Sequence, residues 1–344
     1  MRARARGATI ARVSTLILTQ PEIRALLPMQ KCMELVADAL ASLARGEGQN
    51  PLRRGMRLED GRGLLGMMPG CTHSPATLGL KVVTVFPGNH GSEWDAHQGV
   101  VMLFDPEHGV PRAILDASEI TAIRTAAASG VATRALARDD AGDLALLGAG
   151  VQARTHLEAM LAARPLRRVR VYSPRAESRA AFAARESERH GLRVEAMASA
   201  RAAVEGADLV CTVTSSREPV LEGRWLAPGC HVNAAGACLP AARELDTEAV
   251  RRARVFVDRR ESALAEAGDL LIPMKEGAFG EAHIQGELGE VLLGKVPGRR
   301  TRDELTLFES LGIAVEDLAA AHYLDRVGRE RGVGVLVELG GRRE

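Results

Sequence analysis

The stretch LALLGAGVQA, residues 144–153, joins an apolar run to the pattern Gly148-x-Gly150-x-x-Ala153. Between a strand and a helix, this pattern is typical of a dinucleotide-binding turn. Gly148 permits the tight turn, Gly150 lets backbone amides approach a pyrophosphate, and Ala153 allows close packing of helix on strand. The helix opens at Val151 and Gln152, where its amide end gives the phosphates a positive potential. A tight turn without a ligand is the alternative interpretation.

Strand-like and helical segments alternate regularly from residue 143 onward. The predicted strands are DLALLGAG, RVRVYS, DLVCTVTS, CHVNAAG and RVFVD, and the segments between them include the helical stretches ARTHLEAMLAA and AESRAAFAARESERH. Nearly continuous apolar strands that alternate with helices predict a doubly wound parallel sheet of the Rossmann type. This context favours the dinucleotide interpretation of the glycine turn.

The end of the second strand of this unit bears on the choice of dinucleotide. A free ribose 2′-hydroxyl is usually bound by an acidic residue about 20 residues after the glycines. Here VRVYS ends at Ser173, and Arg175 follows two residues later. Without a carboxylate to repel a 2′-phosphate, and with an arginine available to bind it, the sequence favours NADP(H). NAD(H) stays an alternative, since Arg175 is otherwise a solvated loop residue.

The first part of the chain has a different pattern. A predicted helix through EIRALLP and KCMELVADALASLA precedes short β-like runs over residues 50–118, which indicate a mostly antiparallel sheet. The Ala-rich stretch EITAIRTAAASGVATRALA is predicted to bridge to the second domain, and LFESLGIAVEDLAAAHYLDRV to return as one long helix. We therefore predict an α/β fold with a Rossmann-type sheet over residues 126–318. An α+β domain comprises residues 1–125 with 319–344.

Composition excludes several classes of function. The net charge is +1 and no apolar run is long enough for a membrane span, so we expect neither nucleic-acid nor membrane partners. The five cysteines form no CxxC pair and the nine histidines no HExxH motif, so we expect no metal, and a reducing cytoplasm. The basic N-terminal residues lead into the strand-like VSTLILT and a capping box at Thr19 and Glu22, which argues against a targeting peptide.

From about residue 14 to about residue 325 the sequence resembles the ornithine cyclodeaminase/μ-crystallin family. The matching stretches occur in the family's order: PLRR, LGLKVVTVFPGN, HQGVVMLFD, ITAIRTAAAS, LGAGVQA, NAAGA, AGDLL, GELGEV and FESLGIAVED. The resemblance implies a substrate-binding and dimerisation domain, a Rossmann domain, a cleft between them and a homodimer.

The resemblance also implies a site for the carboxylate of an α-amino or α-imino acid. The matching positions are Arg53, Lys81 and Arg124, with Arg54 as a competitor of Arg53. Planar arginines hold a carboxylate through two hydrogen bonds, and a lysine adds a mobile donor. An unpaired ammonium in the apolar strand around Lys81 would be costly. Retention of all three cations favours an enzyme over a binding protein.

Further contacts follow from the same resemblance. Thr125 is expected near the cofactor phosphates, Thr214 and Ser215 beside the adenosine or the nicotinamide ribose, and Val232 and Ser310 at the nicotinamide. His97 falls in a matching segment near the cleft, where a structural role is an equal alternative.

Cys238, in GACLPAAREL, aligns with an aspartate that binds the side-chain amine in ornithine cyclodeaminases. A neutral thiol cannot replace that charge, so cyclodeamination is disfavoured unless Glu244 or Asp246 substitutes. We therefore expect Cys238 to line the substrate pocket.

The sequence thus predicts an NADP(H)-dependent reductase or dehydrogenase that acts at the α-carbon of a small imino or amino acid. Δ1-Pyrroline-2-carboxylate or ketimine reduction is the leading reaction, with Lys81 or a water that it orders as the proton donor. Ornithine cyclodeaminase and alanine dehydrogenase are enzymatic alternatives. A μ-crystallin-like NADP(H)-dependent binding protein is the alternative from another class.

Overall fold

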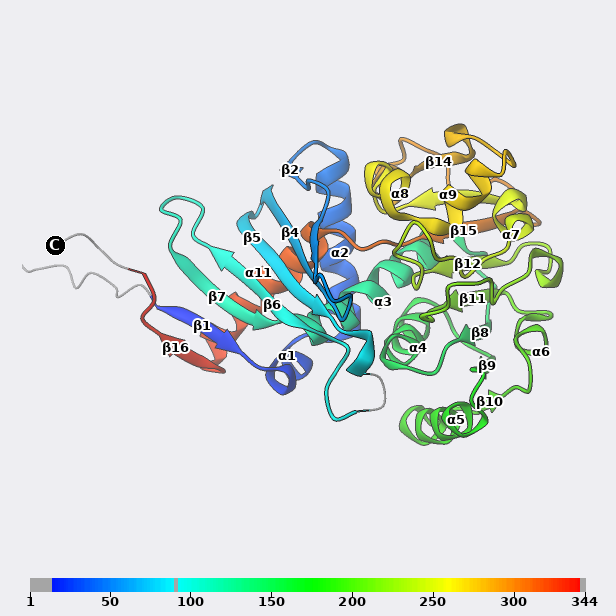
Figure 1. Cartoon of the computed structure of the whole chain (residues 1–344), viewed down its shortest axis with the longest axis horizontal. Helices are drawn as coiled ribbons and strands as arrows, with labels where there is room; N and C mark the ends of the chain where they lie inside the picture. Colours follow the sequence, from blue (N-terminus) through cyan, green and yellow to red (C-terminus); the bar gives the residue numbers. More distant parts are fainter. Residues whose placement is uncertain (1–13, 90–91, 341–344) are drawn as a thin grey trace, which may run out of the picture.

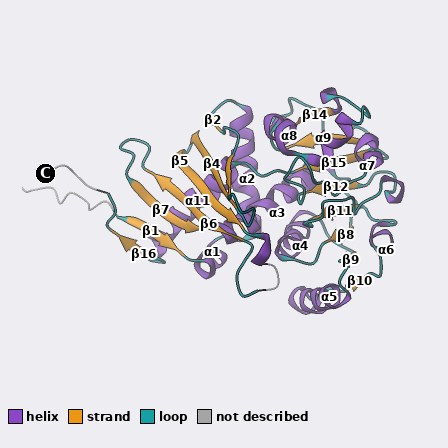
Figure 2. Cartoon of the chain, viewed as in Figure 1, coloured by secondary structure: helices purple, strands orange, loops and turns teal. Residues whose placement is uncertain are grey.

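The computed structural model describes residues 14–89 and 92–340 of the chain, in two lobes (Figure 1). Each lobe is built on an eight-stranded sheet, and helices cover the sheets (Figure 2). The predicted α/β fold class is confirmed. The basic N-terminal extension, residues 1–13, lies outside the described residues.

The nucleotide domain contains a parallel sheet in the order β10-β9-β8-β11-β12-β15-β13-β14. Its strands are β8 (Asp143–Leu147), β9 (Arg168–Tyr172), β10 (Val194–Ala196), β11 (Leu209–Thr212), β12 (His231–Ala234), β13 (Ala253–Val257), β14 (Ile284–Glu287) and β15 (Leu305–Glu309). Its helices are α4 (Val151–Ala163), α5 (Ala176–His190), α6 (Ala200–Val204), α7 (Thr247–Arg252), α8 (Arg260–Glu266), α9 (Gly268–Lys275) and α10 (Leu288–Leu292).

The substrate domain contains a mostly antiparallel sheet in the order β16-β1-β7-β6-β5-β4-β2, with β3 also paired to β4. Its strands are β1 (Thr15–Leu18), β2 (Gly48–Gln49), β3 (Arg54–Arg57), β4 (Leu64–His73), β5 (Ala76–Val85), β6 (His97–Phe104), β7 (Pro111–Asp116) and β16 (Val335–Val337). Its helices are α1 (Gln20–Leu26), α2 (Met29–Ala44), α3 (Ala117–Leu136) and α11 (Ala314–Arg331).

Two predicted helices differ in their bounds. The first is divided into α1 and α2 at Pro28, which has no backbone N–H to continue a helix. The last was predicted to begin at Leu307, but Leu305–Glu309 form β15, fully buried between β12 and β13. A short, mostly apolar run such as LTLFE suits a buried parallel strand as well as a helix, so the pattern alone misled. The predicted capping box is present: Thr19 N–H donates to Glu22 Oε2 at 2.8 Å.

The predicted domain borders, after residues 125 and 318, both fall inside helices. The first lies within α3, which packs on α2 in one lobe and on α4 in the other, so α3 bridges the two domains. The second lies within α11, whose chain leaves the nucleotide domain at residues 310–313. One hydrophobic cluster joins Leu115 and Leu318 to Phe256 and Phe308, so the domains share a continuous core.

The register of the substrate-domain sheet gives its two faces different roles. Met68, Lys81 and Val101 lie side by side on the inner face and are buried. Residues one position away point outward, and this outer face is apolar and partly exposed; we define it by Ile17, Met67, Leu78, Leu80, Val82, Val100, Met102, Phe104 and Ile114. Figure 1 looks onto it, with α11 behind the strands. Lys81 therefore points away from the apolar surface, toward α3 and α11.

Candidate active site

The glycine turn has the geometry that a dinucleotide needs. Gly148 has φ of +123°, and a Cβ there would lie 2.7 Å from the carbonyl oxygen of Val213. At Gly150, the residue before α4, a Cβ would meet no atom within 4 Å, so the backbone is open to a ligand. Ala153 is fully buried against the sheet. Val151 is 55% exposed at the same end of the helix.

Unpaired polar atoms lie at the same sheet edge. Gln152 Oε1, in the turn, and Ser310 Oγ, directly after β15, are buried without a hydrogen-bond partner. Ser310 N–H donates to the carbonyl oxygen of Ala234, which fixes it beside the end of β12. Buried polar atoms of this kind are normally satisfied, and a ligand at this edge would supply partners for them. Together with the open Gly150 turn, they fit a dinucleotide along the carboxyl ends of the strands.

The end of β9 carries two arginines, one of which sequence reasoning missed. Ser173 follows the strand, and Arg175 is the exposed residue that precedes α5. Arg179 lies one turn further along α5, and its Nη1 donates to the Ser173 carbonyl oxygen at 3.0 Å. The i,i+4 spacing of the two arginines in a helical stretch was the signal that could have identified Arg179.

The other predicted cofactor contacts are placed as follows. Thr125 is buried on α3, and Ser215 is exposed after β11. Thr214 N–H donates to Glu244 Oε1 at 2.6 Å. Val232 lies within β12 with 1% exposure, packed in the core of the nucleotide domain. The Val232 side chain therefore packs in the core, and its contact with the nicotinamide stays a prediction.

Lys81 and Arg124 are held by a buried carboxylate. The Lys81 Nζ lies 2.8 Å from Asp317 Oδ2 and 3.0 Å from Oδ1, and the Arg124 Nε lies 2.9 Å from Oδ1. Arg124 Nη1 also contacts Glu316 Oε2 at 2.8 Å. All four side chains are at most 4% exposed. Burial, followed by the charge of Arg124, lowers the pKa of Lys81 to about 8, with Asp317 opposing the shift.

Arg53 approaches the same place from the segment before β3. Its Nε lies 2.6 Å from Glu266 Oε2, and its Nη2 donates to the Leu311 carbonyl oxygen at 2.8 Å. Arg54 is exposed on β3, so the structure selects Arg53 as the inward residue. The charges of Arg53 and Arg124 both act on Lys81, which places the three predicted cations in one electrostatic neighbourhood.

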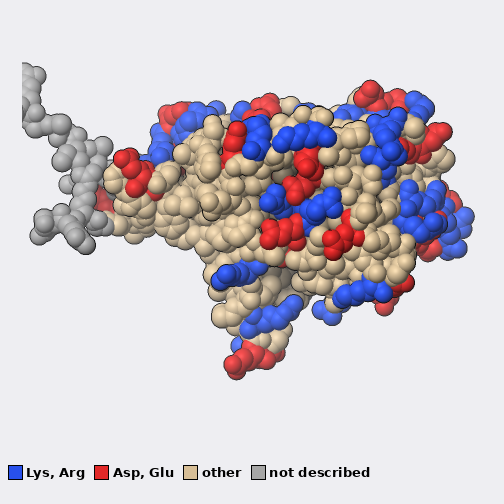
Figure 3. Space-filling view, turned by 90° about the horizontal axis from the view of Figure 1, so that it is seen from above, with Lys and Arg blue, Asp and Glu red and all other residues tan. Residues whose placement is uncertain are grey.

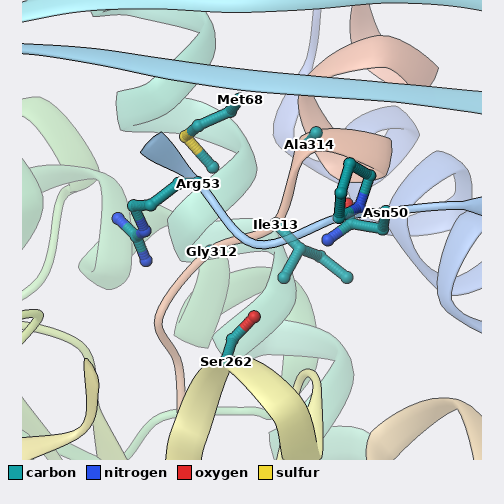
Figure 4. Close-up of a pocket in the computed structure, with 8 residues that line it drawn as sticks. Asn50, Arg53, Met68, Ser262, Gly312, Ile313 and Ala314 are labelled. Atoms are coloured by element: carbon teal, nitrogen blue, oxygen red, sulfur yellow. The ribbon is translucent and has the colours of Figure 1, made fainter. Parts of the chain in front are cut away.

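A small cavity lies between the two domains at this point (Figure 4). Arg53 extends into the view from the segment after Pro51, and Ser262 of α8 reaches up from the nucleotide domain. The chain from Gly312 to Ala314 crosses between them. The lining residues are Asn50, Pro51, Arg53, Met68, Ser262, Gly312, Ile313 and Ala314. Both domains therefore build the site.

Sequence reasoning missed the acids that organise the site. Asp317 and Glu316 stand in FESLGIAVED, where a role was predicted for Ser310 but for neither acid, although the buried Lys81 required a partner. Asp258, after β13, accepts the N–H groups of Leu311 at 2.7 Å and Gly312 at 2.6 Å. These two hydrogen bonds fix the chain segment that crosses from the nucleotide domain to the substrate domain. A side chain at Gly312 would collide with the guanidinium of Arg124, so the crossing packs directly on that arginine.

The model of the ornithine cyclodeaminase/mu-crystallin family matches residues 13–330. The chain belongs to this family. A Δ1-pyrroline-2-carboxylate reductase from Bacillus cereus is 37% identical over 325 residues, 94% of this chain and 100% of the relative. Ketimine reductase mu-crystallin from Mus musculus is 40% identical over 286 residues, 82% of this chain and 87% of the relative.

A solved structure of Δ1-pyrroline-2-carboxylate reductase from Thermococcus litoralis, in complex with NADH and L-proline, has the same fold. Its TM-score is 0.92 at 38% identity, and the alignment covers 94% of this chain and all of that one. The predicted family and the Rossmann-type architecture are thus confirmed.

Within this family framework, Cys238 lies in the loop after β12. Its Sγ is 3.9 Å from the carbonyl oxygens of Ala235 and Leu311, the latter also the Arg53 acceptor. Burial raises the pKa of the thiol, which therefore stays neutral at pH 7. The structure thus places an uncharged side chain next to the cation site.

The two acids that could have replaced the family's aspartate have other partners. Glu244 is buried and accepts the N–H groups of Thr214 and Gly236. Asp246 precedes α7 and accepts the N–H groups of Ala249 and Gly223. Both carboxylates thus hold the backbone, and neither is left to bind a substrate ammonium.

Within residues 14–89 and 92–340, no cluster of His, Cys, Asp or Glu side chains could hold a metal ion. In the same part of the chain, no helix is long and apolar enough to cross a membrane. His97 is the exposed first residue of β6.

Asp317→Asn should destabilise the fold by about 3–5 kcal/mol, because Lys81 and Arg124 would lose a shared buried counter-charge. Urea unfolding at a fixed protomer concentration measures this difference in the free energy of unfolding. Glu330→Gln, at an exposed pair with Arg326 on the same helix, is the control and should change stability by less than about 1 kcal/mol. Equal stability of the two variants would contradict the assigned role of Asp317.

Proposed function

We propose that this protein reduces the C=N bond of a small cyclic α-imino acid, such as Δ1-pyrroline-2-carboxylate, with a nicotinamide dinucleotide. The observation that carries the proposal is that Arg53 lines the cavity between the domains, and that Gly312 of the same lining packs against Arg124, which shares Asp317 with Lys81. The predicted reaction class, an oxidoreductase acting on C=N or CH–NH bonds, is confirmed by the reductase relatives.

The cations have separate tasks in this proposal. Arg53 and Arg124 bind the substrate carboxylate; Nε and Nη1 of Arg124 are held by Asp317 and Glu316, which leaves Nη2 for the ligand. The reduced nicotinamide supplies a hydride when bound. Fixing the carboxylate orients the α-carbon for that transfer, so positioning accounts for much of the rate.

Lys81 provides the proton that completes the reaction. As the hydride reaches the α-carbon, the π electrons of C=N move to the nitrogen, which must then bind a proton. A lysine whose pKa is about 8 is charged at pH 7 and still able to give up its proton, directly or through a water that it orders. Asp317 fixes the ammonium in place, which orients the donor.

The neutral side chain of Cys238 argues for an imino acid without a charged side chain. A side-chain ammonium would need a carboxylate where the thiol stands, and Glu244 and Asp246 bind backbone amides instead. Ornithine cyclodeamination is therefore disfavoured. A small linear imino acid, as in alanine dehydrogenation, fits the same carboxylate site. The burial of Lys81 and Arg124 also favours turnover over mere ligand binding, since buried charge is costly to retain.

A substrate panel tests the function directly. NADPH and NADH oxidation is followed with Δ1-pyrroline-2-carboxylate, its six-membered homologue, and pyruvate with ammonia, while ammonia release is followed with L-ornithine. We expect the highest kcat/KM for a cyclic imino acid and no ammonia from ornithine. Rapid ammonia release would show that the chain is a cyclodeaminase.

The rate should depend on pH through Lys81. The acid form is the donor, so kcat is expected to be constant below pH 8 and to fall about tenfold per pH unit above it. Lys81→Arg cannot donate near neutral pH and should lower kcat by about 100-fold or more, with the fall above pH 8 abolished. If Lys81→Arg keeps the wild-type pH profile, another group is the donor.

For the cofactor we propose a preference for NADPH, supported by Ser173 in place of an acid and by the two arginines at the start of α5. Arg175→Ala should raise the KM for NADPH about tenfold and leave that for NADH unchanged, because only NADPH carries the 2′-phosphate. Arg189→Ala, at the opposite end of α5, is the control. A wild-type preference for NADH would refute the prediction.

We also propose that the protein is a homodimer that pairs through the outer face of the substrate-domain sheet. The resemblance implies a homodimer, and the exposed apolar residues of the substrate domain lie on a face of strands β4 to β7. Figure 3, turned by 90° from the view onto that face, shows a stretch of the substrate-domain half without charged side chains, and side chains of both charges over the nucleotide-domain half. Large exposed apolar surfaces are rare on monomers.

The cytoplasmic location and the lack of nucleic-acid or membrane partners stay predictions.

Leu80→Glu, in the middle of the outer face, should convert the dimer to monomers, because a buried unpaired carboxylate opposes association. Leu292→Glu places the same charge on exposed α10 and should leave the dimer intact. Sedimentation equilibrium at micromolar protein distinguishes the two. A monomeric wild type would refute this interface.

A further inference from the structure

Arg53 belongs to the substrate domain. Its polar partners are Glu266 of the nucleotide domain and a backbone carbonyl of the segment that crosses between the domains. Glu266, the last residue of α8, binds its Nε at 2.6 Å, and the Leu311 carbonyl binds its Nη2 at 2.8 Å. The side chains of Arg53 and Glu266 are 28% and 16% exposed. A guanidinium held by an ion pair at Nε and a hydrogen bond from Nη2 keeps its remaining donors in a fixed direction. These contacts therefore determine how Arg53 faces the cavity.

We propose that Glu266 is a positioning residue that holds Arg53 ready for the substrate carboxylate. The inference rests on the proposed function, in which Arg53 binds that carboxylate. An unrestrained arginine must lose side-chain entropy when it binds a ligand, and an arginine already fixed loses less. Glu266 thus lowers the KM of the imino acid without touching it.

The partners of Arg53 are themselves rigidly placed. A Cβ at Gly268, two residues after Glu266, would lie 2.6 Å from the Leu239 carbonyl oxygen, so the turn between α8 and α9 packs tightly on the Cys238 loop. Asp258 binds the N–H of Leu311 at 2.7 Å, which fixes the second Arg53 acceptor. Burial raises the pKa of Glu266, and the charge of Arg53 opposes that rise. The groups that contact Arg53 are therefore held in place by their own neighbours, independently of Arg53.

A competing role for Glu266 predicts the opposite sign. If its carboxylate occupied the place of the substrate carboxylate, the substrate would have to displace it, and removing its charge would strengthen binding. If it positions Arg53, removing its charge weakens binding. The direction of the change therefore decides between the two roles.

The test compares Glu266→Gln with Glu261→Gln, an exposed glutamate at the start of the same helix. Binding of pyrrole-2-carboxylate, a planar carboxylate probe, to the dinucleotide-loaded protein is measured by calorimetry, together with kcat, KM and Tm. We expect Glu266→Gln to weaken binding of the probe about tenfold and to raise the KM of the imino acid about tenfold. The affinity for the dinucleotide and the Tm should be unchanged. Glu261→Gln should match the wild type. Unchanged or tighter probe binding in Glu266→Gln would overturn the proposal.

A double-mutant cycle with Arg53→Ala makes the test specific. In the Arg53→Ala background, Glu266→Gln should add little further loss, because the residue that it positions is gone. An equal loss in both backgrounds would show that Glu266 acts elsewhere. Wild type that binds the probe but transfers no hydride would refute the proposed reaction and leave the role of Glu266 supported. Wild type that does not bind the probe would overturn the carboxylate site and this inference with it.

Discussion

The site depends on one carboxylate, that of Asp317, which neutralises Lys81 and Arg124 where all three side chains are out of water. Two cations at this depth repel each other, and desolvation disfavours the charged form of the lysine. Asp317 contacts both within 3.0 Å, while Glu316 takes a second edge of Arg124. Because these contacts join β5, α3 and α11, the same cluster that prepares the chemistry also ties the substrate domain together.

The nucleotide domain completes this arrangement. Its parallel sheet ends at the cavity, where Ser310 leaves β15 and the chain crosses to α11 through Gly312. Asp258 fixes that crossing by binding two backbone amides, and Glu266 holds Arg53 across the cleft. Arg53 of the substrate domain thus pairs with a carboxylate of the nucleotide domain, whereas Lys81 and Arg124 are held by acids of their own domain. In the proposed function, these carboxylates orient the groups that bind the substrate.

The sequence predicted the parts whose local patterns are unambiguous. The glycine turn at Gly148 follows an apolar strand and precedes a helix, and the alternation after it leaves few architectures other than a parallel sheet. Lys81 in an apolar strand signalled a buried charge. The resemblance supplied Arg53 and Arg124, and burial then separated Arg53 from Arg54.

The remaining features of the site depend on contacts between residues that are far apart in the sequence. Lys81 and Asp317 are 236 positions apart, so no local pattern pairs them. Residues 305–309 form a short, mostly apolar run that suits a strand as well as a helix. The core position of the Val232 side chain could not be read from the resemblance that predicted its cofactor contact. Glu244 and Asp246 accept backbone N–H groups from residues outside their own motif, and no local pattern predicts such partners.

The central claim is that the clustered cations present the α-carbon of an imino acid to the nicotinamide. The most direct measurement is isotope transfer, using Δ1-pyrroline-2-carboxylate with reduced dinucleotide deuterated at the transferring C4 position. The account predicts proline that carries one deuterium at the α-carbon, detected by mass spectrometry and proton NMR. Dinucleotide oxidation without proline, or proline without deuterium at that carbon for either C4 epimer, would contradict it.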